Sequence, residues 1–358
     1  MVISLTFKKK QTMKKYFIFL ASAAMLFATS CAKEEVNTTG ETELITVQLN
    51  PETKTALGAE GTTTWDADDE VSVTVGGEVV GTLSLVKGST FSGEITAGLS
   101  GAATLNYPAG VTAVPASQAA VKGSFADGAA LLEGTTTVED LRAGNSVELK
   151  NKTALLKFTV DQAGDVTFEV GTAKYTVTGC KTDETYYACV APAENVSFVA
   201  RIGGYLSRKA SANVTFTASK VANLEALPAP VACEWGLVGQ HQGWTLNESA
   251  LTKLYKEKEN LFVVKNIKLQ STGFKFTELS NTNWDLTFGS HSGTYVYNLS
   301  DGWYAGIYTN NRGDKSNDIK VSEWNKTYDV YLRYKVIADW GKELAFAIVE
   351  AGQEYPTY

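Results

Sequence analysis

The chain of 358 residues is long enough for two or three domains. Hydrophobic residues make up 44% of it and charged residues 20%, so most of the chain can bury a core and is not a disordered tail. The net charge is −7, with no Lys/Arg block after residue 15, which excludes a nucleic-acid binder. The two histidines, His241 and His291, are too few for a His-rich metal site and leave little choice of base for a catalytic triad.

The first 30 residues have the pattern of a secretory signal. Five lysines between positions 8 and 15 precede an apolar run of about 13 residues from Tyr16 to Ala28, which is too short to span a membrane as a helix. Met13 is an alternative start of the same signal, in which case residues 1–12 are an over-extended start. The signal predicts export of the rest of the chain.

Cys31 follows the small residues Ala28, Thr29 and Ser30. This arrangement resembles the lipobox of bacterial lipoproteins, which implies cleavage before Cys31 and lipidation of it; ordinary signal cleavage beside an incidental cysteine is the alternative. The next residues, 32–35 (Ala-Lys-Glu-Glu), resemble the surface-export signal of Bacteroidetes lipoproteins. Several acyl chains on one cysteine anchor a protein stably. Residues 31–43 are polar and predict a flexible tether.

Short alternating segments with turn residues between them run from position 44 to 228. Residues 44–49, 71–75, 79–85 and 155–160 are examples, and this spacing predicts one or two β-sandwiches. The chain as a whole is therefore predicted to be all-β, with two or three sandwich domains in tandem.

Trp65 and the acidic residues that follow it, up to Glu70, stand directly before a predicted strand. Together with residues 53–55 (Thr-Lys-Thr) and 151–158, this pattern resembles the fimbrillin-like lipoproteins of Bacteroidetes over residues 44–228. The acidic run lacks a glycine and a bidentate glutamate at the spacing of a calcium loop, so it predicts a solvated turn rather than a calcium site. No metal site is expected.

Three further cysteines follow Cys31. Residues 175–178 and 186–190 flank a polar turn and predict a hairpin across which Cys180 and Cys189 face each other. Export permits a disulfide between them, and two buried free thiols are the alternative. Cys233 has no partner in this prediction.

Residues 227–230 (Leu-Pro-Ala-Pro) indicate a rigid linker, and residues 231–358 predict one further β-sandwich, with a short helix or turn near 251–256. Six of the seven tryptophans lie in this last region. That number exceeds what a small sandwich core usually holds, so we expect some indoles at the surface. The apolar face of a sugar ring stacks on an indole, and the rim of hydroxyls requires fixed donors and acceptors.

The segments 235–239, 243–244, 273–276, 283–285 and 316–319 occur in an order that resembles the starch-binding modules of SusE/SusF-type outer-membrane lipoproteins. The resemblance implies that Trp244 and Trp284 form a sugar platform and that Lys275 bonds the hydroxyls, with Asn283 as a weaker partner. Alternation around Lys275 supports its placement, because Phe274 and Phe276 should face the core and Lys275 the opposite face. Packing of the two indoles within their loops is the alternative. Trp235, on an apolar strand, is predicted to be core.

These observations predict a non-catalytic lipoprotein that is anchored to the outer membrane by Cys31 and exposed at the cell surface. The resemblance to SusE/SusF-type lipoproteins implies that it binds an α-glucan or starch-like polysaccharide for an uptake system, with a TonB-dependent glycan transporter complex as a partner. No cofactor is expected. A fimbrial accessory or adhesin subunit is the alternative, with residues 44–49 as an exchangeable strand. A glycoside hydrolase would need two paired carboxylates, and nothing in the sequence pairs Asp285, Asp301 and Asp318.

Overall fold

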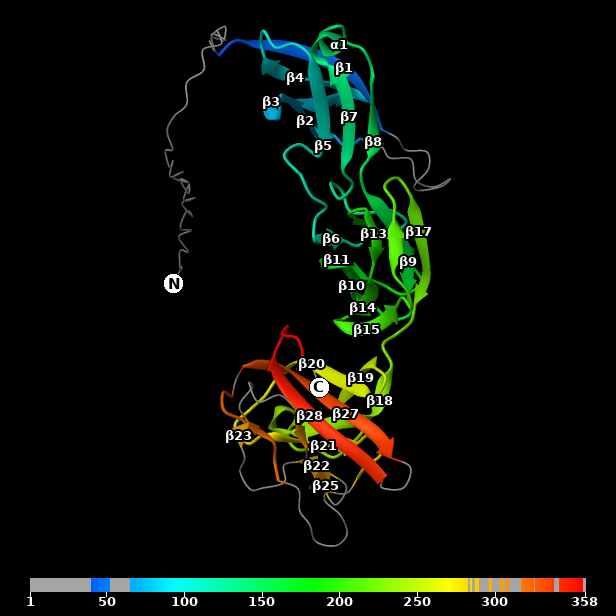
Figure 1. Ribbon diagram of the computed structural model, residues 1–358, viewed down its shortest axis with the longest axis vertical. Coiled ribbons are helices and arrows are strands. Elements are labelled where there is room, and N and C mark those ends of the chain that lie inside the picture. The colour runs from blue at the N-terminus through cyan, green and yellow to red at the C-terminus, as the bar shows by residue number, and fades with distance from the viewer. Residues whose placement is uncertain are drawn as a thin grey trace, which may run out of the picture. The chain divides into compact units, whose positions relative to one another are not determined.

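The computed structural model describes residues 40–51, 65–282, 284, 287–289, 296–297, 303–305, 307–308, 317–324, 326–337 and 341–356 (Figure 1). The chain divides into two units, Met1–Gly40 and Glu41–Tyr358. All the elements given below belong to the second unit. The predicted signal, Cys31 and most of the tether lie outside the described residues. The first strand begins at Thr42, two residues inside the predicted tether.

A closed barrel of seven strands forms first, in the order β1-β4-β3-β2-β5-β7-β8 (Figure 1). Its elements are β1 (Thr42–Pro51), β2 (Glu70–Val75), β3 (Glu78–Lys87), β4 (Thr90–Thr96), β5 (Ala102–Tyr107), β7 (Leu132–Thr137), α1 (Val138–Arg142) and β8 (Val147–Asn151). Strand β1 buries Ile45, Val47 and Leu49 and exposes the residues between them, as a half-buried strand should.

Strand β1 closes the barrel, because it pairs antiparallel with β4 and parallel with β8. Glycines let β3 and β4 approach closely where the sheet curves. A methyl group on Gly93 would overlap the carbonyl oxygen of Thr82, and one on Gly81 would overlap that of Glu94. The sequence predicts an open sandwich here, and the structure differs because these long-range pairings join the two edges of the sheet.

Two sheets that face a common core follow the barrel, in the orders β15-β14-β10-β11-β6 and β12-β9-β17. Their strands, with the hairpin β13-β16, are β6 (Ser117–Ala119), β9 (Ala154–Val160), β10 (Gly164–Val170), β11 (Ala173–Cys180), β12 (Tyr186–Val190), β13 (Ala193–Val196), β14 (Phe198–Ile202), β15 (Tyr205–Lys209), β16 (Val214–Phe216) and β17 (Val221–Leu227). Phe158 and Phe168 meet edge to face across this core, with their ring centroids 5.0 Å apart. This part of the chain is a β-sandwich, as predicted.

A nine-stranded sheet forms the C-terminal part, in the order β24-β28-β27-β20-β19-β18-β21-β22-β25, with β23 and β26 paired separately. Its elements are β18 (Ala232–Gly239), η2 (Gln240–Gln242), β19 (Thr252–Lys258), β20 (Leu261–Lys268), β21 (Phe274–Glu278), β22 (Thr287–Gly289), β23 (Val296–Tyr297), β24 (Tyr304–Ala305), β25 (Ile307–Tyr308), β26 (Lys320–Val321), β27 (Thr327–Ile337) and β28 (Gly341–Glu350).

Nearly every described element is a strand, so the prediction of an all-β fold is confirmed. The expected helix or turn near residues 251–256 is wrong, because Leu254 is buried in β19, which pairs with both β18 and β20. Within the described part of the chain, no helix is long and apolar enough to cross a membrane.

Candidate functional site

The short loop after β18 carries Trp244 and is held by its own hydrogen bonds. The helix η2 ends at Gly243, whose backbone is left-handed, and Trp244 is left-handed as well, with φ of 56°. The Trp244 N–H donates to the Gly239 carbonyl at 2.9 Å, and the Gln242 amide side chain bonds both the N–H and the carbonyl of Thr245. A bulky residue in this conformation costs on the order of 1–3 kcal/mol and marks positions where strain is tolerated for function.

The loop after β21 carries Trp284 and is held by hydrogen bonds of buried polar side chains. The Asn281 side-chain amide donates to the Thr277 hydroxyl at 2.8 Å, and the Thr287 hydroxyl donates to the Trp284 carbonyl at 3.1 Å. Asn281, Thr277 and Thr287 are all buried. These hydrogen bonds hold the backbone near Trp284 in place, and 43% of Trp284 remains exposed.

The two loops bring the two predicted platform residues together. The ring centroids of Trp244 and Trp284 are 6.0 Å apart, and the ring planes are inclined at 49°. Trp244 is partly exposed. An exposed large aromatic surface that two separate loops assemble is a common feature of binding sites. Neither ring is fully buried, and the contact between the two rings is also what packing of the indoles within their loops would give.

Lys275 lies on β21 between two phenylalanines that are fully buried, so its predicted placement on the opposite face is confirmed. Its side chain is less open than expected, at 15% exposed, and its ammonium lies 3.7 Å from the Asp318 carboxylate. Partial burial lowers the pKa of Lys275, while Asp318 acts to raise it. Lys275 pairs in register with Val238, one residue before the Gly239 carbonyl that binds Trp244.

The other tryptophans of this region have different environments. Trp235 is fully buried on β18, as predicted. The Trp303 N–H donates to the Pro356 carbonyl at 2.8 Å, and the Arg333 guanidinium lies 5.5 Å from the Trp303 ring centroid. Trp324 is 55% exposed. Asn283, Asp285, Asp301 and Trp340 lie outside the described residues, so the role predicted for Asn283 stays a prediction.

His241 lies in η2, just before Trp244, and its titration depends on how deeply this segment is buried. Its Nε2 lies 3.1 Å from the Thr252 hydroxyl, and burial lowers its pKa from 6.5 to about 4. The unfolded chain therefore takes up this proton at a higher pH than the folded chain does. The stability contributed by the neutral ring is fully present above pH 6.5 and is lost as the pH falls from 6.5 through 4.

We expect the ring protons of His241 to titrate near pH 4 in an NMR titration, and the melting temperature of His241→Gln to fall less between pH 6.5 and 4 than that of the wild type. Carboxylates also titrate in this range, so the difference between the two proteins is the quantity that matters. A His241 midpoint near 6.5 would contradict the burial of this ring.

The predicted disulfide between Cys180 and Cys189 is not formed, and both thiols are buried and free. The hairpin prediction is wrong because β11 and β12 belong to different sheets, with Cys180 opposite Gly164 and Cys189 opposite Leu155. Burial raises the pKa of each thiol to about 12 and that of the Cys233 thiol to about 11. All three thiols are therefore protonated at neutral pH and poorly reactive.

The acidic turn before β2 has a structural role. The Trp65 ring contacts Phe91 and Tyr107 edge to face, at centroid distances of 4.9 and 5.2 Å. The Tyr107 hydroxyl donates to Asp69 at 2.8 Å, and burial raises the pKa of the Asp69 carboxyl. Asp69 is thus buried and bonded rather than solvated as predicted. Among the described residues, no cluster of His, Cys, Asp and Glu is arranged to hold a metal ion.

The fold and the site together define a multidomain all-β protein with an exposed aromatic pair on its C-terminal sheet. No protein-family model matches the chain, and no curated protein matches it. Eight chains of solved structure do match. One is a "putative cell adhesion protein" from Bacteroides ovatus, with 12% identity and a TM-score of 0.36, covering 61% of this chain and 97% of that one.

A fimbrial protein from Bacteroides ovatus is 11% identical with a TM-score of 0.31, and the match covers 62% of this chain and 57% of that one. A second "putative cell adhesion protein", from Bacteroides thetaiotaomicron, is 11% identical with a TM-score of 0.28, and the match covers 51% of this chain and 91% of that one. All three neighbours are named as cell adhesion or fimbrial proteins, and none of the three is named for starch binding.

Proposed function

We propose that this protein is a non-catalytic cell-surface adhesion protein that holds polysaccharide on the Trp244–Trp284 pair. The observation that carries the proposal is the geometry of that pair, with ring centroids 6.0 Å apart and planes inclined at 49°. A flat indole offers a stacking surface to the C–H face of a sugar, and two inclined indoles can follow the curve of a helical glucan. We therefore propose an α-glucan as the polysaccharide.

Polar groups near such a platform would bind the sugar hydroxyls. Lys275 of β21 and Asp318, which lies 3.7 Å from it, supply a donor and an acceptor. Asn283 is proposed as a further partner from the loop of Trp284. Because each sugar contact is weak, the affinity for a polymer would come from the number of repeating units that can engage.

The proposed location follows from the N-terminal sequence. A lipid on Cys31 would anchor the chain to the outer membrane, and the tether after it would place the folded part outside the cell. There the protein would capture glycan beside an outer-membrane uptake system, with a TonB-dependent transporter complex as a partner.

Affinity electrophoresis tests this function. We expect the wild-type protein to migrate more slowly in a gel that contains amylopectin than in a plain gel, and the double variant with Trp244→Ala and Trp284→Ala to lose most of this retardation. Trp324→Ala is the matched control, because Trp324 is also exposed but is not part of the pair. Equal mobility of the wild type in gels of amylopectin, glycogen, pullulan, xyloglucan and galactomannan would contradict the proposal.

A fimbrial subunit is the second candidate, and strand β1 is the observation that favours it. This strand is the first described element of the chain, and it supplies Ile45, Val47 and Leu49 to the barrel core. If β1 left, the barrel would expose these core positions and the edges of β4 and β8, which another chain could fill with an equivalent strand.

Strand exchange can be measured directly. A chain without residues 42–51 should bind a peptide of residues 42–51, or assemble with other copies, as seen by native mass spectrometry. The full chain should stay monomeric under the same conditions. If the truncated chain remains monomeric and does not bind the peptide, the fimbrial-subunit candidate is excluded.

A further inference from the structure

A polar row crosses the outer face of the barrel. Directly opposed residues of neighbouring strands place Ser72 of β2, Asn106 of β5, Glu133 of β7 and Lys150 of β8 side by side. Opposed residues in an antiparallel sheet project from the same face, and strands lie about 4.8 Å apart. The row across four strands is therefore about 14 Å long.

A second row runs beside the first, from Val79 of β3 through Thr74 and Thr104 to Thr135. The two rows together present hydroxyl, amide, carboxylate and ammonium groups next to one exposed valine.

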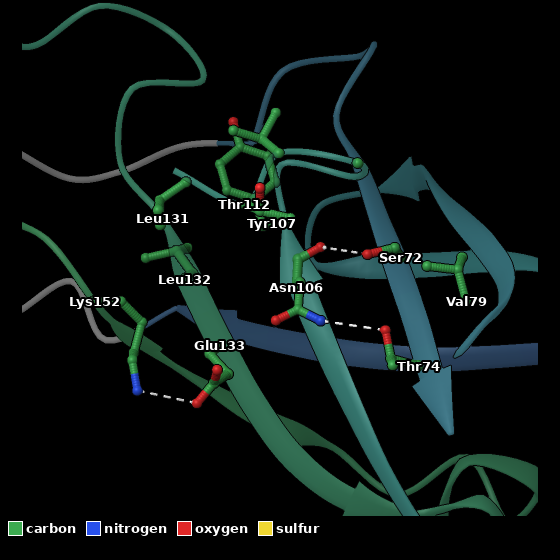
Figure 2. Close-up of a pocket in the computed structure, with 12 residues that line it drawn as sticks. Ser72, Thr74, Val79, Asn106, Tyr107, Thr112, Leu131, Leu132, Glu133 and Lys152 are labelled. Atoms are coloured by element: carbon green, nitrogen blue, oxygen red, sulfur yellow. Dashed lines mark hydrogen bonds and ion pairs between the residues drawn. The ribbon is translucent and has the colours of Figure 1, made fainter. Parts of the chain in front are cut away.

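The surface over these rows is hollowed rather than flat. A cavity of about 320 Å³ lies over Ser72, Thr74 and Asn106, next to Leu131 (Figure 2). Val111 also lines it. A second hollow of about 440 Å³ is lined by Thr135, Thr136 and Ser146. Both cavities include Glu133 and Lys152 in their linings, so they are neighbours on the barrel surface, and together they are called the barrel groove. Each cavity is within the size range of small-molecule sites.

Most of the backbone beneath the barrel groove is already paired. Strands β2 and β5 have a neighbour on both sides in the closed barrel, whereas β7 and β8 pair with each other only at Leu132–Asn151 and Glu133–Lys150. Over β2 and β5 an extended peptide therefore cannot add to the sheet through main-chain hydrogen bonds. In that part of the groove, side chains must recognise any ligand.

The charges in the barrel groove cancel. Glu133 and Glu148 balance Lys150 and Lys152, and the Lys152 ammonium lies 3.1 Å from the Glu133 carboxylate (Figure 2). An anionic or cationic ligand would meet no net opposite charge. A neutral polar ligand can accept from the ammonium and donate to the carboxylate without breaking a buried pair, because both side chains are partly exposed.

The polar groups at the bottom of the groove make only long hydrogen bonds to one another. The Asn106 side-chain amide donates to the Thr74 hydroxyl at 3.5 Å, and the Ser72 hydroxyl donates to the Asn106 carbonyl at 3.4 Å (Figure 2). Both distances are at the weak limit for a hydrogen bond. A ligand hydroxyl at normal distance would gain more from these groups than they gain from each other.

From these observations we propose that the barrel groove is a second binding site, for a neutral oligosaccharide chain. Asn106, Ser72 and Thr74 bind its hydroxyls, the Glu133–Lys152 pair spans the middle of the chain, and Val79 and Leu131 contact its C–H faces. This site does not depend on the indole pair. A chain with both sites could hold one polymer at two points, which would strengthen attachment by avidity.

The test uses the full chain carrying Trp244→Ala and Trp284→Ala, so that the indole pair is removed. Methyl groups of Val and Leu are labelled, and NMR spectra are recorded with maltoheptaose, cellohexaose, xylohexaose and mannohexaose. We expect at least one of these sugars to shift the methyl resonances of Val79, Val111 and Leu131. Asn106→Leu together with Glu133→Gln should weaken that binding at least tenfold.

Gln48→Leu is the matched control, since it removes an exposed amide from β1 opposite Thr90; it should leave binding unchanged. No shift with any of the four sugars, or shifts that survive the Asn106 and Glu133 substitutions, would overturn the barrel site. Tighter binding of hexagalacturonate than of the neutral sugars would overturn it as well. If wild-type protein is retarded by glycan while the indole variant shows no methyl shift, only the barrel site fails; the reverse pattern removes the indole site alone.

Discussion

Replacing Trp235 by alanine should lower the free energy of unfolding of the C-terminal region by about 3–5 kcal/mol, the usual cost of deleting a large aromatic side chain from a core. Trp235 is fully buried on β18, and its ring centroid lies 5.9 Å from that of Tyr334. Strands β19 and β21 flank β18, so the sheet can collapse only partly into the space that the indole leaves.

Tryptophan fluorescence during urea unfolding measures this loss, because six of the seven tryptophans lie after residue 230. Trp324→Ala removes the same side chain from a position that is 55% exposed, and it should change the unfolding free energy by about 0.5 kcal/mol or less. Similar losses for the two variants would show that Trp235 does not fill the core.

The contrast between these two tryptophans shows what a sequence pattern can predict. Trp235 lies among apolar residues on a strand, and Lys275 lies between two phenylalanines, so alternation alone assigns each of them to a face of the sheet. The same reasoning identifies β1 by its alternating Ile45, Val47 and Leu49. In each case the information is local, because a strand has a period of two wherever it sits.

Partners of strands are not local information, and here the predictions fail. Cys180 and Cys189 are near in sequence, yet β11 and β12 pair with strands of different sheets. Closure of the barrel depends on the pairing of β1 with β8, about 100 residues later, and no local sequence pattern indicates this pairing. The close pairing of Lys275 with Asp318 was missed for the same reason.

The Trp244–Trp284 pair can be predicted from the sequence only in part, because it depends both on local patterns and on strand pairing. Display of Trp244 on a loop follows from the glycine before it, and the loop position of Trp284 follows from its polar neighbours. Their approach to 6.0 Å also needs β18 and β21 to be adjacent, with Asn281 and Thr287 fixing the second loop. Buried amide-to-hydroxyl bonds such as Asn281 to Thr277 are invisible in sequence, because either residue is equally common in exposed loops.

The left-handed conformation of Trp244 makes the function of this residue separable from its structural role. We expect Trp244→Gly to weaken glycan binding about 30-fold, which corresponds to about 2 kcal/mol for the loss of an aromatic anchor. Stability should change little, because glycine removes a backbone cost of about 1–2 kcal/mol at φ of 56° and so offsets the lost contact with Trp284. Isothermal titration calorimetry and thermal unfolding measure the two quantities on the same sample.

Trp284→Ala completes the comparison, since it removes the second ring without relieving strain. If the two indoles form one platform, the second substitution should cost much less binding energy in the presence of the first than alone, with a coupling of about 0.5 kcal/mol or more. Additive losses would mean two independent sugar contacts. If both single variants bind glycan as tightly as the wild type, and Trp244→Gly is no less stable than the wild type, the indoles have no binding role and Trp244 has no packing role. The glycan proposal would then be wrong.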